Sequence, residues 1–316
     1  MISKRSAIVL LYSICATSPY RLFPAEAQAG SPLSELKRAN AAYQEGHLDK
    51  SENILRSIIK SYSKDTDKDK VYASACGTLG LILKQSGRLS DAEKYSKQAV
   101  EIAKVKYGET DPETLALINN LGTLRIAQGN YVKAEEIYRA LLALSRESKQ
   151  QNPLSHANKL NNFATALSCQ GKLDEAEKAL NQSIAIVESN CGSGSWKTLT
   201  FRANLAKLYQ DQHRVSEAEK IYNEVLEKAD LSNRDYLIVV GPVMGNLGEI
   251  YRERKNYSKA RDLYEKALSI ETKLYGEFDI RVAMDWNNLA ILLQSEKKFH
   301  ESLSAYTHSI TIHEKA

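Results

Sequence analysis

Residues 121–141 read LGTLRIAQGNYVKAEEIYRAL, and versions of this stretch recur along the chain. Its leading dipeptide has equivalents at intervals of 42 residues: Leu79-Gly80, Leu121-Gly122, Phe163-Ala164, Leu205-Ala206, Leu247-Gly248 and Leu289-Ala290. Thirteen residues after each leading Leu or Phe stands a small residue: Ala92, Ala134, Ala176, Ala218, Ala260 and Ser302. Self-similarity at a fixed period of about 20–50 residues is typical of repeat architectures. The sequence therefore predicts an array of repeats.

The spacing inside one copy indicates two helices. Apolar residues recur at intervals of three and four, as in Ala134, Ile137, Tyr138 and Leu141, which is the pattern of an amphipathic helix. The position four residues after the small residue holds Ser96, Tyr138, Leu180, Tyr222, Tyr264 and Tyr306. A looser first copy has Ala39, Gly46 and Ser51 in register, which makes seven copies. One hairpin cannot bury its apolar stripe alone, so we expect an all-α solenoid with the first helices on its inner face.

A turn is expected between the two helices of each copy. Glycine accepts a positive φ at a helix C-terminus, and the first four copies carry Gly46, Gly87, Gly129 and Gly171 there. His213, Lys255 and Lys297 take this place in the last three copies, at a cost of about 1–2 kcal/mol each if they are left-handed. Second helices are expected to start with capping boxes: Ser90 with Glu93, Asp174 with Glu177, and Ser216 with Glu219.

The consensus L-G/A-x2-Y/L-x3-G-x-Y/L-x2-A-E-x2-Y resembles the tetratricopeptide repeat (TPR). That resemblance implies a right-handed α-solenoid of seven or so helical hairpins. The 42-residue period resembles the kinesin light chain subtype, as does the connector Tyr107-Gly-Glu-Thr-Asp-Pro-Glu-Thr114, with degenerate copies at Cys191-Gly192 and Tyr275–Asp279. The heptad coiled coil of a kinesin light chain is missing from the sequence. We therefore expect the architecture without the motor-adaptor role.

The first 29 residues have the features of a secretory signal peptide. Lys4 and Arg5 form a positive segment, and Ala7–Ala16 is apolar but too short to span a bilayer. The segment Ala25–Ala29 offers two A-x-A sites, so we expect cleavage after Ala27 or Ala29 and a periplasmic or secreted protein. The alternative is an uncleaved N-terminal anchor that keeps the protein near a membrane.

The remaining residues, 30–316, are expected to form the solenoid, with repeats at approximately 33–62, 71–108, 112–149, 153–191, 196–231, 238–275 and 280–316. The formal net charge of +4 is small for 316 residues and argues against nucleic acid as a partner, because phosphate binding needs a concentrated basic stripe. Cys76, Cys169 and Cys191 form no C-x-x-C pair, so inert thiols are expected.

A series of asparagines in phase with the repeats is the candidate binding site. Asn120, Asn162, Asn204, Asn246 and Asn288 directly precede the leading Leu or Phe, Thr78 takes that place in the second copy, and Asn119, Asn161 and Asn287 add a second amide. The TPR resemblance implies that this position faces a concave groove, where asparagines hold the backbone or carboxylate of an extended peptide. A carboxamide both donates and accepts, which suits a peptide group of any sequence. The alternative is that these amides fix the packing of neighbouring helices.

Specificity is expected from variable neighbours on the same face: Thr123, Thr165, Lys207 and Glu249 one turn further on, then Lys84, Ile126, Ser168, Gln210, Arg252 and Gln294. In chaperone-binding relatives, a carboxylate clamp pairs such asparagines with Lys or Arg. Lys207 and Arg252 are the candidates for that role in this sequence.

Signatures of catalysis and of cofactor binding are missing from the sequence. None of the six histidines forms an H-E-x-x-H motif or an i, i+4 pair, and no G-x-S-x-G or phosphate-binding G-x-x-x-x-G-K-S/T occurs. We therefore expect no metal, no cofactor and no enzymatic activity, but a protein or peptide partner. The competing hypothesis is self-association, as a structural component of the cell envelope, through an uncapped last repeat with an apolar edge formed by Ile291, Leu292, Leu303 and Ile310.

Overall fold

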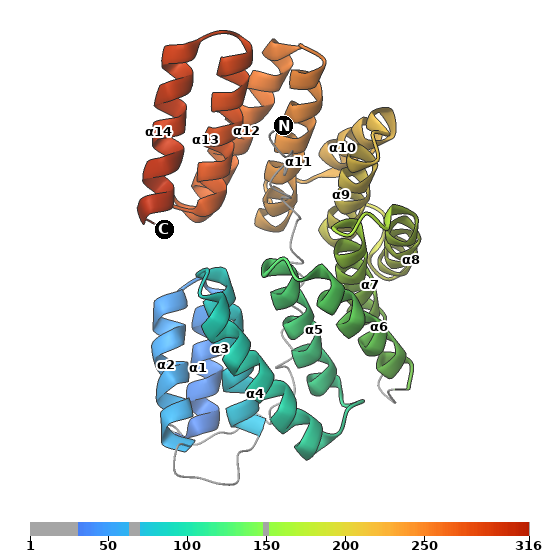
Figure 1. The fold of residues 1–316 in the computed structure, drawn as a ribbon, viewed down its shortest axis with the longest axis vertical. Helices are drawn as coiled ribbons and strands as arrows, with labels where there is room; N and C mark the ends of the chain where they lie inside the picture. Colours follow the sequence, from blue (N-terminus) through green and yellow to red (C-terminus); the bar gives the residue numbers. More distant parts are fainter. Residues whose placement is uncertain (1–30, 63–69, 148–151, 316) are drawn as a thin grey trace. The chain divides into compact units, whose positions relative to one another are not determined.

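The computed structural model describes residues 31–62, 70–147 and 152–315, and in these residues the chain forms fourteen α-helices and no strand (Figure 1). The predicted all-α fold class is therefore confirmed. The predicted signal peptide, residues 1–29, lies outside the described residues. The described residues form two compact units that divide within one helix: the N-terminal unit ends at Ala179, and the C-terminal unit begins at Leu180.

The helices follow one another as seven pairs. They are α1 (Pro32–Gln44) and α2 (Leu48–Ser61), α3 (Lys70–Gln85) and α4 (Leu89–Tyr107), α5 (Pro112–Ala127) and α6 (Tyr131–Glu147), α7 (Pro153–Ser168) and α8 (Leu173–Cys191), α9 (Trp196–Asp211) and α10 (Val215–Lys228), α11 (Arg234–Glu253) and α12 (Tyr257–Tyr275), and α13 (Ile280–Ser295) and α14 (Phe299–Lys315). Each pair is one repeat, with an odd-numbered first helix and an even-numbered second helix. The sixth repeat starts four residues earlier than expected, at Arg234.

One turn geometry connects the two helices in every repeat. The residue after the left-handed position donates its N–H to the carbonyl five residues earlier, at 2.8–3.0 Å, as a Schellman motif requires. The left-handed position is Gly in the first four repeats, as predicted, and His213, Lys255 and Lys297 in the last three, with φ of 60°, 61° and 63°. A left-handed non-glycine residue costs about 1–2 kcal/mol, so the last three turns are strained where the first four are not.

The predicted capping boxes are wrong, because the turn leads into the second helix sooner than expected. α4 begins at Leu89 with Arg88 as its N-cap, and α10 begins at Val215 with Arg214 as its N-cap, in both cases without a side-chain cap. Ser90 and Ser216 therefore lie inside the first turn rather than before it. α8 likewise begins at Leu173, before Asp174. Side-chain caps stand mainly on first helices instead, at Ser31, Asp111, Asn152, Ser195, Asn233 and Asp279.

The two helices of a repeat pack closely where a glycine of the first helix meets an aromatic ring of the second. A Cβ on Gly122 would lie 2.7 Å from Cζ of Tyr138, and a Cβ on Gly248 would lie 2.7 Å from Cε1 of Tyr264. The ring of the second helix therefore lies directly on the backbone of the first. Both tyrosines are buried, as is Tyr222 at the equivalent position of the fifth repeat. This contact explains why a small residue and a ring recur together in the sequence.

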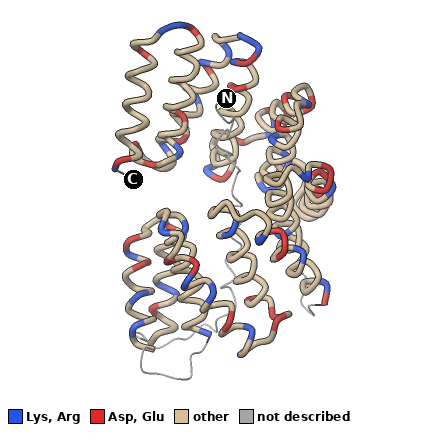
Figure 2. The backbone as a smooth tube through the Cα atoms, in the orientation of Figure 1, with Lys and Arg blue, Asp and Glu red and all other residues tan. Residues whose placement is uncertain are grey.

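Ion pairs join successive repeats on the side of the second helices. A glutamate near the start of a second helix binds a base of the next repeat; the pairs are Glu52–Arg88, Glu93–Arg125, Glu135–Lys172 and Glu219–Arg254. Between the sixth and seventh repeats the base stands on the second helix and the acid on the next repeat, because Arg261 pairs with Glu296. Acidic and basic residues accordingly alternate along both units rather than gather in blocks (Figure 2). The bonds to Arg125 and Lys172 hold the pKa values of Glu93 and Glu135 at about 2.

Candidate functional site

First helices of successive repeats contact one another inside each unit. α1 contacts α3, α3 contacts α5 and α5 contacts α7 in the N-terminal unit, and α9 contacts α11 and α11 contacts α13 in the C-terminal unit. No comparable contact joins α2 with α4, α4 with α6, α10 with α12 or α12 with α14. The first helices are therefore closer together than the second helices and line the inner side of each unit, as expected. We call this side the inner face.

Polar side chains of the candidate positions meet where first helices touch. In the N-terminal unit, Thr78 Oγ1 donates to Asn40 Oδ1 at 3.1 Å, and Lys84 Nζ donates to Thr123 Oγ1 at 3.0 Å. In the C-terminal unit, Gln210 Nε2 donates to Glu249 Oε2 at 2.7 Å. Each of these bonds links neighbouring repeats. The polar side chains of the inner face therefore help to join one repeat to the next.

Several of the predicted asparagines have a packing role. Asn162 Nδ2 donates to Asn119 Oδ1 at 3.1 Å, and Tyr138 Oη donates to the backbone oxygen of Asn119 at 3.2 Å. Asn161 and Asn162 are 2% and 5% exposed, and Asn204 is 6% exposed. In the C-terminal unit, burial raises the pKa of the Tyr222 hydroxyl, and the nearby side chain of Asn246 opposes that rise. The bond between Asn119 and Asn162 joins the third and fourth repeats, in line with the packing role that the sequence left open as an alternative.

Other asparagines of the series keep part of their side chains in contact with solvent. Asn120, Asn287 and Asn288 are half-buried. Within the described residues, no hydrogen bond of the structure involves their side-chain amides. Asn288 approaches α11, with its Nδ2 3.9 Å from where a Cβ on Gly245 would stand. Asn120 stands on α5 in the N-terminal unit, and Asn287 and Asn288 stand on α13 in the C-terminal unit, so each unit has such an amide on a first helix.

The two candidate bases of a carboxylate clamp differ in availability. Lys207 is 7% exposed and its Nζ lies 2.7 Å from Oδ1 of Asp211, so its charge is already paired. Arg252 is half-buried, and its closest carboxylate, on Glu253, is 3.9 Å away. The structure thus gives no pair of open bases beside the asparagines of the C-terminal unit.

Two lysines have unusual surroundings: Lys159, which sequence reasoning missed, and Lys84, which it named as a specificity residue without expecting its burial. Burial lowers the pKa of Lys84 on α3 to about 8, and it lowers the pKa of Lys159 on α7 to about 8. Lys159 is only 6% exposed and stands in the repeat position that holds Leu117, Phe201 and Val243 elsewhere. Alignment of the repeats by their 42-residue period would have revealed this charge, because the position is charged only in the fourth repeat, at Lys159, and in the seventh, at Asp285.

The apolar edge expected on the last repeat is only partly present. Leu292 is fully buried and Ile291 is half-buried, because both lie on α13 inside the last repeat. Leu303 and Ile310 on α14 are 65% and 56% exposed, and Phe299 on the same helix is 63% exposed. Self-association through this helix stays a prediction.

The described residues contain no group of three or more His, Cys, Asp or Glu side chains placed to hold a metal ion. Cys76, Cys169 and Cys191 are present as thiols, as expected. Of the helices that the structure describes, none combines the length and the hydropathy needed to cross a membrane.

Comparison with protein families gives matches over most of the chain. A model described as tetratricopeptide repeat matches residues 71–147, 155–230 and 240–315, and a second model of the same description matches residues 204–273. Comparison with curated proteins finds no match.

Solved structures resemble the chain in fold. The apo form of RapI is similar over 90% of this chain and 98% of its own, with 16% sequence identity and a TM-score of 0.67. NprR, solved in complex with its cognate peptide NprX, is similar over 90% of this chain and 80% of its own, with 15% identity and a TM-score of 0.59. A kinesin light chain of Podosopora anserina with nearly identical TPR-like repeats is similar over 62% of this chain and 92% of its own, with 21% identity and a TM-score of 0.53.

Proposed function

The chain belongs to the tetratricopeptide repeat family, and on that basis we propose that it is a protein-interaction scaffold that binds an extended peptide segment on its inner faces. The observation that carries this proposal is the position of Asn120, Asn287 and Asn288, whose half-buried amides lie on first helices and have no partner among the described residues. NprR, which has a similar fold, was solved with a peptide, and this supports the class of ligand.

The spacing of the repeats suits an extended chain. Packed helices lie about 8–10 Å apart, and an extended peptide advances about 3.3 Å per residue. Roughly every third residue of a bound peptide would therefore meet the next first helix. A carboxamide at that point can accept from the peptide N–H and donate to its carbonyl.

The amides alone are not sufficient for tight binding. Each hydrogen bond contributes about 0.5–1.5 kcal/mol net, whereas a micromolar complex requires about 8 kcal/mol. The remainder has to come from side-chain contacts, and Arg252 and Gln294 are exposed enough on the inner face to supply them. The repeats take up nearly all of the described chain, so we also propose that the protein is not an enzyme.

The proposal is tested with peptides selected from a random dodecapeptide library displayed on phage. We expect the variants Asn120→Ala and Asn287→Ala/Asn288→Ala to weaken binding of selected peptides roughly tenfold, because each removes one or two hydrogen bonds. The double variant Asn181→Ala/Asn223→Ala is the matched control, since both residues are exposed on second helices. Titration calorimetry gives the affinities, and circular dichroism checks that helicity is unchanged. Equal losses in the control, or unchanged affinity in both inner-face variants, would reject the proposed site.

We further propose that residues 1–29 direct export from the cytoplasm. Support comes from Lys4 and Arg5, the short apolar segment behind them and the A-x-A sites at Ala25–Ala29. N-terminal sequencing of the protein from an envelope or culture fraction is expected to begin at Gln28 or Gly30. A sequence that begins at Met1, from protein found in the cytoplasm, would contradict export.

A further inference from the structure

Two acidic residues stand where most other repeats carry apolar or small side chains. Asp285 on α13 takes the repeat position of Ala75, Leu117, Phe201 and Val243, which holds Lys159 in the fourth repeat. Glu271 on α12 takes the position of Ala103, Ser145, Val187 and Ala229. The contact between the sixth and seventh repeats is thus the one that brings two carboxyl groups together in a position that is apolar at most other junctions.

Both carboxyl groups are buried and incompletely bonded. Glu271 is 3% exposed and Asp285 is 7% exposed. Glu271 Oε2 and Asp285 Oδ2 have no hydrogen-bond partner among residues 31–62, 70–147 and 152–315. A buried carboxylate without partners is strongly unfavourable, whereas the protonated acid is tolerated much better.

A glycine on α11 makes room for one of these acids. A Cβ on Gly241 would lie 2.5 Å from Oε1 of Glu271, so the carboxyl group lies directly against the backbone of α11. The same repeat position holds Ala73, Leu115, Ala157, Leu199 and Ala283, all of which have a Cβ. Gly241 and Glu271 therefore form a matched pair specific to this junction.

The charges that surround the pair do not neutralise it. Arg281, at the start of α13, binds Asp279 with Nε and Nη2, both at 2.7 Å, and its guanidinium lies 3.2 Å from the ring centroid of Tyr275 on α12. Burial raises the pKa of Tyr275, and the positive charge of Arg234, at the start of α11, opposes that rise. α14 closes the adjoining core with Ile312 and with Ser309, whose hydroxyl donates to the carbonyl of Ala283 at 2.7 Å.

The pKa values follow from these surroundings. Burial raises the pKa of Glu271 to about 7, against the opposing attraction of Arg281, and Asp279 adds to the rise. Burial and the neighbouring charge of Glu271 raise the pKa of Asp285 to about 8. Folded-state pKa values above the unfolded ones mean that the stabilisation is complete below about pH 4 and is lost as the pH rises through about 7–8.

We propose that Glu271 and Asp285 form a proton-controlled lock between the sixth and seventh repeats, in which the last hairpin packs firmly on α12 while both carboxyl groups are protonated and loosens when they ionise. Ionisation places two like charges in an apolar contact, and the contact can relieve this only by admitting water. Because α13 also carries Asn287 and Asn288, the lock adjusts the inner face of the C-terminal unit to pH. This inference does not depend on the proposed peptide binding.

Hydrogen exchange measured by mass spectrometry at pH 6.0 and pH 8.5 tests the lock in the full chain. After correction for the intrinsic pH dependence of exchange, we expect amides of α13 and α14 to exchange at least tenfold faster at pH 8.5, because one pKa unit changes the ionised population tenfold. Exchange in α9 and α10 is expected to stay constant. In the variant Glu271→Gln/Asp285→Asn, the pH effect on α13 and α14 is expected to disappear.

The matched control is Glu265→Gln/Asp262→Asn, because both of these acids are exposed on α12; it is expected to keep the wild-type pH effect. The lock is overturned if wild-type α13 and α14 show no pH effect, or if the neutral variant keeps it. If that variant does not fold, carbon-13 NMR of the wild-type carboxyl groups decides. Titration midpoints above pH 6 for Glu271 and Asp285 support the lock, and midpoints near pH 4 overturn it.

Discussion

Replacement of Tyr222 by alanine is expected to lower the free energy of unfolding of the C-terminal unit by about 3–5 kcal/mol, the usual cost of deleting a buried aromatic ring. Tyr222 is 0% exposed and lies in a core with Leu199, Ala206, Val225 and Leu247. Its ring occupies the repeat position where Tyr138 and Tyr264 lie against glycines, so removal leaves a cavity between the helices of one repeat.

Two further variants separate the ring from its hydroxyl group. Tyr222→Phe removes the bond from Tyr222 Oη to Gln210 Oε1 at 3.3 Å and is expected to cost about 0.5–1.5 kcal/mol. Tyr222→Leu introduces the residue that the fourth repeat has at this position, Leu180. Its loss of stability is expected to lie between those of Tyr222→Phe and Tyr222→Ala. Urea denaturation, followed by hydrogen exchange in α9–α11 to localise the loss, measures all three. A Tyr222→Ala variant no less stable than Tyr222→Phe would contradict the packing described.

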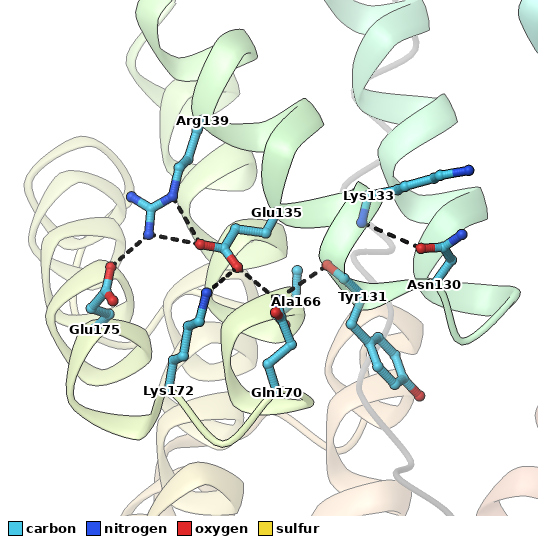
Figure 3. A network of polar contacts seen from close by, with 9 residues as sticks. All are labelled: Asn130, Tyr131, Lys133, Glu135, Arg139, Ala166, Gln170, Lys172 and Glu175. Atoms are coloured by element: carbon cyan, nitrogen blue, oxygen red, sulfur yellow. Dashed lines mark hydrogen bonds and ion pairs between the residues drawn. The ribbon is translucent and has the colours of Figure 1, made fainter.

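Reversal of the charge at Glu135 is expected to destabilise the N-terminal unit by about 2–3 kcal/mol, between the values for exposed and for buried ion pairs. Glu135 is 7% exposed and accepts bonds from Arg139 and Lys172, at 2.8 and 2.6 Å, and from Gln170 at 2.8 Å (Figure 3). In Glu135→Lys, three cationic groups face one another across the junction of the third and fourth repeats. Arg139 and Lys172 keep contact with solvent, which limits the loss of stability.

The neighbouring residue provides the control for this variant. Glu136→Lys makes the same change of charge at an exposed position and is expected to alter stability by less than about 0.5 kcal/mol. Thermal unfolding of both variants at low and high salt measures the difference, which should shrink as salt screens the charges. Equal midpoints for the two variants would show that the network of Glu135 does not join the repeats.

The same network has a pH dependence opposite to that of the acidic pair in the last junction. Because the pKa of Glu135 is lowered to about 2, its stabilisation is present above the unfolded value near 4.5 and is lost as the pH falls through 2. The pKa values of Glu271 and Asp285 are raised, so their contribution to stability is present at low pH and is lost as the pH rises. Acid therefore weakens the contact between the third and fourth repeats, and alkali weakens the contact between the sixth and seventh repeats.

The periodic features of the fold could be predicted from the sequence, because they depend on local spacing. The 42-residue period located the helix pairs, and the position of Gly129 located a left-handed turn at φ 71°, with Lys255 in the same geometry. The capping boxes could not be placed in this way. Ser90 and Glu93 have the right spacing, but the Schellman turn ends at Arg88, whose N–H donates to the carbonyl of Leu83. Arg88, rather than Ser90, is therefore the N-cap of α4.

The candidate site was predictable only as a set of positions. Asn120 and Asn162 occupy equivalent places in the sequence, yet Asn162 is buried in a bond to Asn119 while Asn120 is half-buried. Which amide is covered depends on the side chains that the neighbouring repeat presents, and these vary from repeat to repeat. The pairing of Lys207 with Asp211 likewise depends on a residue outside the repeat consensus.

The location of a bound peptide can be measured directly by NMR with a nitroxide-labelled peptide from the phage selection. The side-chain amide signals of asparagine report on the proposed contacts themselves. If the inner faces hold the peptide, the signals of Asn120, or those of Asn287 and Asn288, broaden on binding, while those of Asn181 and Asn223 on second helices stay sharp. Broadening confined to Asn181 and Asn223 would place the peptide on the opposite side and contradict binding at the inner faces.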